Sequence, residues 1–521
     1  MVRIRFFVPV LLAGLCCPAV LLGPALGRSA AAAPESELRQ SLESFARAYA
    51  VVEQNFAEPV PPDQSIYNGA IQGMLRTLDP HSNFLDPKTY QLLQQDQRGQ
   101  YYGVGMEISM DGPVVIVTQP FPGSPAARAG VRRGDSVVEI DGENVKGLNS
   151  AQVADKLKGP RGTQVQLAVA REGVEKPLPF TITRDAISRS DVDAFWLRPG
   201  VAYLRVRSFT NQNTGQEVED RFKELGEDKI EGLILDLRDN GGGLVSESVT
   251  VAGRFLKKGQ TVVSHRGRAS AEQVFRAKGQ AADRKYPIVV MVNRYSASAA
   301  EIVAGALQDH DRGWVMGEST FGKGLVQAQF PLSEGAALLL TIARYYTPSG
   351  RLIQRDYEHM SFFEYAYGRG ESRNIKDEKH TDAGRTVYGG NGIAPDEKYE
   401  NPKVTAFQRR AFGRFAFFHF ANTYFGGRVP KLPENWKPDA EVMKQFQAFL
   451  VRRGIEFTPA EFEQNRKWVE EQLRLEMYTR AFDRKRAEQA QVEDDPQVHK
   501  AVGSLPTAQA LLAQVRLATA K

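Results

Sequence analysis

Residues 232–243 of this 521-residue chain have the sequence GLILDLRDNGGG, and they decide the fold class. The mostly apolar segment 232–237 predicts a buried strand, and residues 244–255, beyond the glycines, predict a helix. A strand that ends in a glycine-rich turn and leads into a helix is typical of α/β proteins, whose ligands gather where the strands end.

The three glycines at 241–243 are compatible with two roles. Consecutive glycines let backbone N–H groups point into a cavity, which suits the binding of an anion or an oxyanion. The same residues would also make a tight turn with charged neighbours in solvent. This stretch alone does not separate the two roles.

The alternation of strands and helices continues on both sides of this turn, from residue 200 to residue 350. Predicted strands cover 201–206, 232–237, 288–293 and 314–317, and predicted helices cover 216–225, 244–255 and 299–308. This pattern predicts an α/β core.

A second turn between a buried strand and a helix has the sequence SASAAE at residues 296–301. A serine there lies at a helix N-terminus, where the helix dipole stabilises developing negative charge. Ser296 or Ser298 would equally serve as an N-cap, because either one followed by Glu301 resembles a capping box. Taken alone, the sequence of this turn favours the capping role.

A third turn, GESTFGKG at residues 317–324, resembles a nucleotide-binding P-loop. Gly324 occupies the place of the hydroxyl residue that must reach Mg²⁺, and residues 325–330 alternate like a strand, so a nucleotide site is excluded. What remains is Lys323 between two glycines. A desolvated lysine loses its proton more easily and can serve as the general base for a serine near neutral pH.

The seven histidines are poor alternatives as the base for such a serine. His310 belongs to the predicted core but lies at the far end of the helix that Ser298 begins. About 12 residues of helix span about 18 Å, which is too far for a proton transfer.

The segments that flank the core have other patterns. Short strands with glycine turns are predicted at 104–110, 114–118, 136–140, 165–170 and 178–182, with one helix at 150–157. Residues 36–98, and the chain from 403 onward, have apolar residues at helical spacing. The first of these helical regions carries no catalytic signal and is predicted to dock or to dimerise.

Composition and charge exclude several classes of protein. With 42% hydrophobic and 25% charged residues the chain can bury large cores, which argues against a disordered, collagenous or polytopic membrane protein. The net charge of +5 falls to about +2 without the three arginines of the first 28 residues, so no basic face for nucleic acid is indicated.

The first 33 residues resemble a secretory signal peptide, with two arginines, an apolar run at 6–22 and small residues at 29–33. An uncleaved membrane anchor is the less favoured alternative, because Pro24 interrupts the run. Both cysteines, Cys16 and Cys17, lie in this leader. A mature chain would therefore have no disulfide, catalytic thiolate or cysteine zinc site.

Seven groups of residues, in this order along one chain, resemble the C-terminal processing proteases, the PDZ-containing serine peptidases of family S41. They are 70–75 with 78–82, 102–106, 236–243, 296–301, 321–324, 346–350 and 392–396. The resemblance implies a multidomain α/β fold. Its predicted parts are a signal peptide (1–33), a helical N-terminal arm (34–98), a β-rich PDZ domain (99–186), an α/β protease core of crotonase/ClpP-like type (187–400) and a helical C-terminal region (401–521).

The same resemblance implies the catalytic residues. The nucleophile falls on Ser298 rather than Ser296, the general base on Lys323, and the residue that orients this lysine on Gln327. Many members of the family have a further serine where this chain has Ala300, but that side chain is not part of the triad.

The implied oxyanion hole consists of two backbone N–H groups. One belongs to Ala299 and the other to the turn at 241–243, where Gly242 is chosen without a decisive argument. Each donor of this kind typically contributes about 10²–10³ to the rate.

The PDZ domain implies a way to choose substrates. Backbone N–H groups of Gly103, Val104, Gly105 and Met106 would hold a terminal carboxylate while the tail adds beside the next strand. The predicted partners are therefore proteins or peptides with apolar free C-termini, and a bound tail would complete the active site. No metal, organic cofactor or nucleic acid is implied.

The predicted function is an exported, periplasmic serine endopeptidase that cleaves with a Ser–Lys(–Gln) site. The alternative is a non-catalytic or adaptor-dependent periplasmic PDZ scaffold; a hydratase-like acyl-CoA enzyme is disfavoured by the leader and the PDZ pattern. Residues 401–521 match no part of the family, and would cover the substrate path, bind a partner or build a homo-oligomer.

Overall fold

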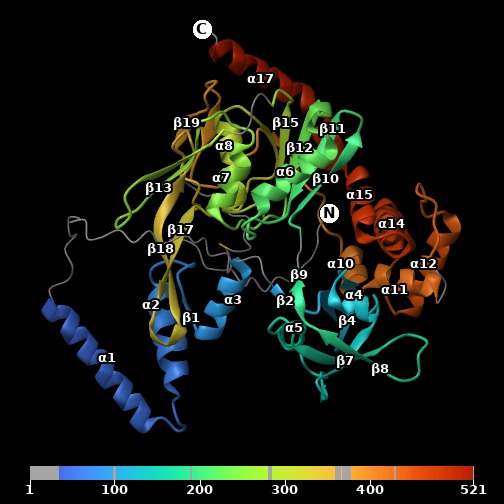
Figure 1. Ribbon diagram of the computed structural model, residues 1–521, viewed down its shortest axis with the longest axis horizontal. Coiled ribbons are helices and arrows are strands. Elements are labelled where there is room, and N and C mark those ends of the chain that lie inside the picture. The colour runs from blue at the N-terminus through green and yellow to red at the C-terminus, as the bar shows by residue number, and fades with distance from the viewer. Residues whose placement is uncertain are drawn as a thin grey trace.

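The computed structural model describes residues 35–97, 101–187, 190–279, 284–357, 365, 377–426 and 430–519. The predicted leader at 1–33 lies outside the described residues. Figure 1 shows an α/β body at the top, a helical arm below it on one side, and a β-rich module below it on the other. The predicted multidomain α/β fold class is confirmed.

A six-stranded sheet forms the centre of the α/β body. In spatial order its strands are β10 (Val192–Arg198), β11 (Val201–Val206), β12 (Gly232–Asp236), β15 (Ile288–Val292), β16 (Trp314–Gly317) and β21 (Glu397–Lys398). The strands from β11 to β21 run parallel, and β10 joins antiparallel to β11. Because parallel strands end at the same edge, the three predicted turns after β12, β15 and β16 meet there.

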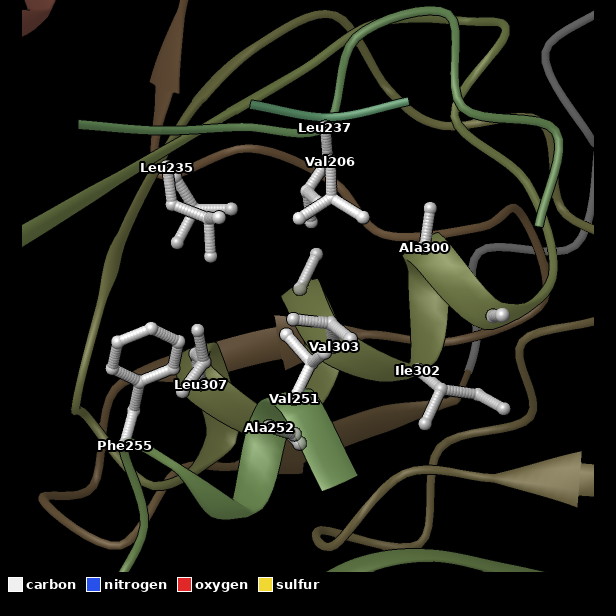
Figure 2. Close-up of a cluster of buried hydrophobic side chains, with 14 of the residues drawn as sticks. Val206, Leu235, Leu237, Val251, Ala252, Phe255, Ala300, Ile302, Val303 and Leu307 are labelled. Carbon is white, nitrogen blue, oxygen red and sulfur yellow. The ribbon is translucent and has the colours of Figure 1, made fainter. Parts of the chain in front are cut away.

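One face of this sheet is covered by α6 (Thr214–Leu225), α7 (Val245–Gly253) and α8 (Ala299–Asp309). Figure 2 shows Leu235 pointing from the sheet toward Val303 and Leu307 of α8. These side chains are completely buried, and burial of each contributes about 1.5–3 kcal/mol to stability. This packing fixes the N-terminus of α8 at the sheet edge.

The opposite face is covered by two helices from the C-terminal region, α16 (Pro496–Gly503) and α17 (Leu505–Thr519). Val498 and Leu505 belong to the same buried cluster as Tyr203, Ile234 and Met291 of the sheet. These two helices are therefore a layer of the α/β body (Figure 1).

The arm consists of α1 (Glu35–Asn55), a π-helix (Asp63–Ile71), α2 (Gln72–Arg76), β1 (Asn83–Leu85) and α3 (Pro87–Gln97). Its strand β1 pairs with β18 (Ala337–Tyr346), which also pairs with β17 (Leu325–Pro331) and β13 (Thr261–Arg266). Strand β14 (Gln273–Arg276) pairs with β13 at the edge. The arm is thus not purely helical, because β1 extends the sheet that contains β17, the strand that begins two residues after Lys323.

The β-rich module is a second body with its own core. Its elements are β2 (Tyr101–Gly103), β3 (Met106–Asp111), β4 (Val114–Pro120), α4 (Pro125–Ala129), β5 (Ser136–Ile140), β6 (Glu143–Asn144), α5 (Ser150–Leu157), β7 (Gln164–Ala170), β8 (Leu178–Thr183) and β9 (Asp185–Ile187). The sheet order β3-β4-β5-β7-β8 places β3 at an edge, and α5 packs on the same core. The predicted strand at 136–140 and helix at 150–157 are confirmed.

The remaining C-terminal helices pack beside the β-rich module. They are α10 (Ala406–Gly413), α11 (Ala416–Phe425), α12 (Ala440–Arg452), α13 (Pro459–Gln464), α14 (Arg466–Ala481) and α15 (Arg484–Glu493). Their core is rich in phenylalanine, with Phe407, Phe417, Phe446 and Phe462 all buried. A separate two-stranded sheet is formed by β19 (Glu378–His380) and β20 (Thr386–Tyr388). Within the described ranges, no helix has both the length and the apolar character needed to cross a membrane.

Candidate active site

Ser298 lies at the turn where β15 leads into α8. Its side chain is 1% exposed, and its φ of 54° with ψ of −112° is a conformation that L-residues rarely adopt. Its Oγ has no hydrogen-bond partner among the residues that the structure describes. A strained turn that carries an unpaired hydroxyl at a helix N-terminus is suited to a nucleophile.

Ser296 is held in a different way. Its Oγ donates to the carbonyl of Leu237 at 2.8 Å and accepts from the N–H of Asn293 at 3.0 Å. These bonds tie the end of β15 to the end of β12. The hydroxyl of Ser296 therefore has a structural role in this turn.

Glu301 joins the two turns that carry Ser298 and Lys323. Its Oε2 accepts from the N–H groups of Ser298 at 2.7 Å and of Lys323 at 2.8 Å, and its Oε1 accepts from the N–H of Gly322 at 2.7 Å. Burial raises the pKa of this carboxyl, and the hydrogen bonds oppose the rise. The sequence indicated only a capping role for Glu301, so its role in joining the turns was missed.

Lys323 is enclosed at the start of β17. Its side chain is 2% exposed, and burial lowers the pKa of its ammonium to about 8 against the attraction of Glu301 and Asp79. The glycine after it is required by space, since a Cβ on Gly324 would lie 2.5 Å from the backbone nitrogen of Gln354. A buried lysine with this pKa can accept a proton near neutral pH.

Gln327 lies on β17, four residues after Lys323. Its side chain is bound by the arm. Its Nε2 donates to the carbonyl oxygen of His81 at 2.8 Å, and both residues are buried. The His81 ring contacts the hydroxyl of Tyr365 at 2.8 Å. Burial and the charge of Lys323 lower the pKa of His81 to about 3, so this imidazole is neutral.

Asp79 shapes the turn that presents His81. Its Oδ1 accepts from the N–H groups of His81 at 2.7 Å and Ser82 at 2.8 Å, and its Oδ2 accepts from the Ser82 hydroxyl at 2.6 Å. The arm was predicted to carry no catalytic signal, but the carbonyl of its His81 binds Gln327, which is one of the predicted site residues. The signal was present in residues 78–82, which carried the family resemblance.

Gly242 lies directly against the Ser298 turn. A Cβ there would be 2.8 Å from the Cβ of Ser298 and 3.1 Å from the backbone nitrogen of Ala299, and its φ is +98°. Its N–H donates to Oδ1 of Asn240 at 2.8 Å, while Nδ2 of Asn240 donates to the carbonyl of Val206 at 2.9 Å. The glycine chosen from the sequence therefore lies against the Ser298 turn, with its N–H bound to the side chain of Asn240.

A buried ion pair supports this glycine turn from behind. Arg238 contacts both carboxylate oxygens of Asp236, and its other side reaches Asp495 at 2.8 Å. The charge of Arg238 holds the pKa of Asp236 well below its usual range in spite of burial. Because Asp495 caps α16, this ion pair links the turn to the C-terminal region.

The β-rich module presents its predicted carboxylate loop beside the edge strand β3. The carbonyl oxygens of Val104 and Gly105 accept from Ala126 at 2.8 Å and Phe121 at 2.9 Å, inside the module. Since the C=O and N–H of a trans peptide point in opposite directions, the N–H groups of Gly105 and Met106 are directed away from those contacts. Such a pair of N–H groups can form a nest for an anion.

His310 takes no part in this site. It caps the C-terminal end of α8, and its ring contacts Asp382 and the carbonyl of Thr261, both at 2.7 Å. Across the described segments, no group of three or more His, Cys, Asp or Glu side chains is arranged to hold a metal ion.

Comparisons with known protein families match three parts of the chain. Residues 200–358 match peptidase family S41, residues 116–171 match the PDZ domain, and residues 25–89 match the N-terminal domain of the activating protease CtpB. The S41 match ends at residue 358, so the C-terminal helices lie beyond all three matches.

The chain is also similar to individual carboxy-terminal processing proteases. A carboxy-terminal-processing protease of Bartonella bacilliformis is 42% identical over 300 residues, which are 57% of this chain and 68% of the relative. A carboxyl-terminal-processing protease of Synechocystis is 41% identical over 55% of this chain and 68% of its own length. The solved photosystem II D1 C-terminal processing protease is 32% identical, with a TM-score of 0.39 over 71% of this chain and 89% of that one.

Proposed function

This chain belongs to the carboxy-terminal processing proteases of peptidase family S41, and we propose that it cleaves proteins with Ser298 as nucleophile and Lys323 as general base. The observation that carries the proposal is the shared acceptor Glu301, whose one oxygen fixes the backbone of both residues. The unpaired Oγ of Ser298 and the lowered pKa of Lys323 support the same roles.

In the proposed reaction, the neutral amine of Lys323 takes the proton of the Ser298 hydroxyl while Oγ attacks the carbonyl carbon of the scissile peptide. The tetrahedral intermediate collapses when the lysine gives this proton to the leaving amine. Water then hydrolyses the acyl-enzyme with the same base. A pKa of about 8 leaves about one tenth of the lysine neutral at pH 7, which is enough for turnover.

Gln327 is proposed to orient the side chain of Lys323. Its own amide is held in place by the arm, because it donates to the carbonyl of His81. The N–H of Ala299, the first residue of α8, is proposed as one oxyanion donor. Gly242 supplies the second when its N–H exchanges Oδ1 of Asn240 for the oxyanion of the substrate. The resting structure would thus have an incompletely open oxyanion hole.

Substrate choice is assigned to the PDZ domain. A free terminal carboxylate would bind the N–H groups near Gly105 and Met106, while the tail adds to the open edge of β3 beside α5. A tail on β3 would lie near apolar side chains that are only partly buried, such as Ile108, and these would favour apolar C-termini.

The test is the cleavage of a disordered protein with an apolar C-terminus by leaderless wild type, Ser298→Ala and Lys323→Ala. Activity in the wild type alone would support the assignment, and each substitution is expected to lower kcat by at least about 10³-fold. Cleavage that survives in Ser298→Ala would overturn it. A substrate with an amidated C-terminus should be cleaved more slowly, and equal rates for both would remove the role of the PDZ domain.

Export to the periplasm is proposed from the leader at 1–33, with an uncleaved anchor as the alternative. Fractionation of cells with an antibody to the protein would test it, and a cytoplasmic pool of full-length chain would contradict it. A protein that binds tails but cleaves none, alone or with an adaptor protein, would instead support the scaffold alternative.

A homo-oligomer through α1 is proposed from the surface of that helix. Leu38, Leu42 and Phe45 are 56%, 59% and 47% exposed at helical spacing, on a helix that extends away from the body (Figure 1). Two copies of one apolar stripe can cover each other by twofold symmetry. Sedimentation of wild type and of Leu42→Lys should show a larger species in the wild type alone.

A further inference from the structure

The C-terminal helices contact the very strand of the PDZ domain on which a substrate tail would add. Glu107 and Asp111 of β3 alternate with Met106 and Ile108, which belong to the PDZ core, so they lie on the outer face of the strand. There Glu107 forms an ion pair with Arg484 at the start of α15.

Two further contacts hold the PDZ domain to the same helices. His419 of α11 contacts Asp111 of β3 at 2.7 Å. Arg133 pairs with Glu476 of α14 and lies over the ring of Phe418, 4.3 Å from its centre. The β3 strand and the loop of Arg133 are therefore both attached to the C-terminal region.

The same helix α15 also contacts the protease core. Arg484 donates to Glu488 one turn later at 2.8 Å, and Glu488 pairs with Arg207, which follows β11. The side chains of Glu488 and Arg207 are each 19% exposed. Ion pairs with this degree of burial are screened less by salt and water than fully exposed ones.

From Arg207 the contacts continue to the oxyanion turn. The carbonyl of Val206, the preceding residue, accepts from Nδ2 of Asn240 at 2.9 Å, and Oδ1 of Asn240 accepts from the N–H of Gly242 at 2.8 Å. The carbonyl of Gly242 accepts from Phe209 at 2.9 Å, two residues beyond Arg207. The backbone on either side of Arg207 therefore contacts the side chain that binds the N–H of Gly242 and also binds the carbonyl of Gly242.

We propose that α15 couples the binding of a substrate tail on β3 to the release of the Gly242 N–H into the oxyanion hole. The path runs from Glu107 through Arg484 and Glu488 to Arg207, and from there through Val206 and Asn240. Arg484, Glu488 and Asn240 are positioning residues on this path, because none of them is assigned a contact with the reacting atoms. The proposal rests on the proposed function, since it concerns the activation of that same site.

The helix is suited to this role because it is a short rigid rod with an ion pair to each domain. A bound tail makes β3 an internal strand and so fixes the orientation of the β3 backbone that carries Glu107. The helix then moves as one rigid body and passes the change in the β3 backbone on to Arg207. The coupling then appears as a faster chemical step with a bound tail, and not as tighter tail binding.

The experiment compares kcat for one substrate with a free C-terminus and with an amidated C-terminus in full-length leaderless protein. The first variant is Glu488→Gln, which weakens the pairs of Glu488 with Arg207 and with Arg484 without a new charge. The others are Arg484→Glu and the swap of Glu107→Arg with Arg484→Glu. Arg466→Glu is the matched control, because it breaks an exposed ion pair between the first residue of α14 and Glu463 of α13. Tail affinity is measured separately on the Ser298→Ala background with a fluorescent peptide.

We expect Glu488→Gln and Arg484→Glu to reduce the kcat advantage of the free tail by about fivefold or more, with peptide Kd within about twofold. The swap should recover at least half of the loss, and Arg466→Glu should behave like wild type. An unchanged kcat advantage in both variants overturns the coupling. A loss of peptide affinity of the same size as the loss of kcat also overturns it, because α15 would then only build the groove.

Failure of the proposed function itself has a different signature. In that case the wild type does not cleave, or Ser298→Ala still does, before any α15 variant is compared. The coupling proposal would then fall together with the proposed active site.

Discussion

The backbone N–H groups of Ser298 and Lys323 donate to one and the same atom, Oε2 of Glu301, at 2.7 and 2.8 Å. Two turns that follow different strands, β15 and β16, are thereby fixed relative to each other at their backbones. The backbone positions of the proposed nucleophile and the proposed base are thus fixed relative to each other. Preorganisation of this kind lowers the entropic part of an activation barrier.

Replacement of Glu301 by glutamine should therefore damage catalysis more than binding. The amide would place an NH₂ group against backbone donors that now share a carboxylate, and an unmet buried donor costs about 1–3 kcal/mol. We expect kcat to fall by at least about tenfold while KM changes by less than about threefold. Glu318→Gln, in the same turn but paired with Arg294, is the control that should retain activity.

The pH dependence of kcat/KM should show the titration of Lys323. The base must be neutral, and the pKa of Lys323 is lowered to about 8, so activity should rise as pH increases through about 8. A profile from pH 6 to 10 with an uncharged substrate measures it. A rise centred below pH 6 would contradict the assignment of Lys323 as the base.

The same pKa predicts that Lys323 destabilises the fold. Its pKa is lower in the folded chain than its ordinary value of 10.5, so the unfolded chain binds more protons between about pH 8 and 10.5, and stability rises with pH across that window. Below pH 8 the full cost is present. Lys323→Met should therefore raise the free energy of unfolding at pH 7 by about 1–3 kcal/mol, as measured by urea denaturation.

Asp79→Ala in the arm should lower kcat although it lies in a different part of the chain. The substitution removes three hydrogen bonds that shape the turn of His81, whose carbonyl fixes Gln327. We expect a fall in kcat of about tenfold or more, with unchanged affinity for a tail peptide. Asp86→Ala is matched to it, since Asp86 accepts from the N–H of Thr89 in an exposed turn of the same arm, and it should have no effect on kcat.

Two glycines of the PDZ domain offer a matched pair for the carboxylate loop. Gly105 and Gly112 both have positive φ, at 76° and 59°, but a Cβ on Gly105 would lie 2.4 Å from the Cβ of Ser124 whereas one on Gly112 meets nothing within 4 Å. Gly105→Ala should weaken peptide binding by about tenfold or more, and Gly112→Ala should leave the affinity within about twofold. Fluorescence anisotropy with a free-acid peptide decides between them, and equal effects would remove the loop from the binding site.

Sequence periodicity was sufficient for the elements whose packing is local. The strands at 201–206 and 314–317 were predicted to the residue, because each is a buried apolar run bounded by turn residues. The three turns of the site were found for the same reason. Each follows a strand of the parallel sheet, so their meeting at one edge was a consequence of fold class.

What could not be predicted depends on contacts between distant parts of the sequence. Strand β1 is three residues long and obtains its partner from β18, so periodicity in the arm shows only helices. The approach of His81 to Gln327 follows from that pairing. The packing of α16 and α17 on the sheet could not be predicted from the sequence either. The pattern of an amphipathic helix shows which of its faces is apolar but not which surface this face covers.

The layer formed by α16 and α17 affects how the chain folds during its synthesis. Until these late-synthesised helices arrive, Ile234 and Met291 of the central sheet face water, and Arg238 lacks the carboxylate of Asp495. The sheet edge that bears the serine and lysine turns therefore lacks part of its support until these helices have been synthesised and have packed. We therefore expect the proposed peptidase activity to appear only after α16 and α17 have packed on the sheet.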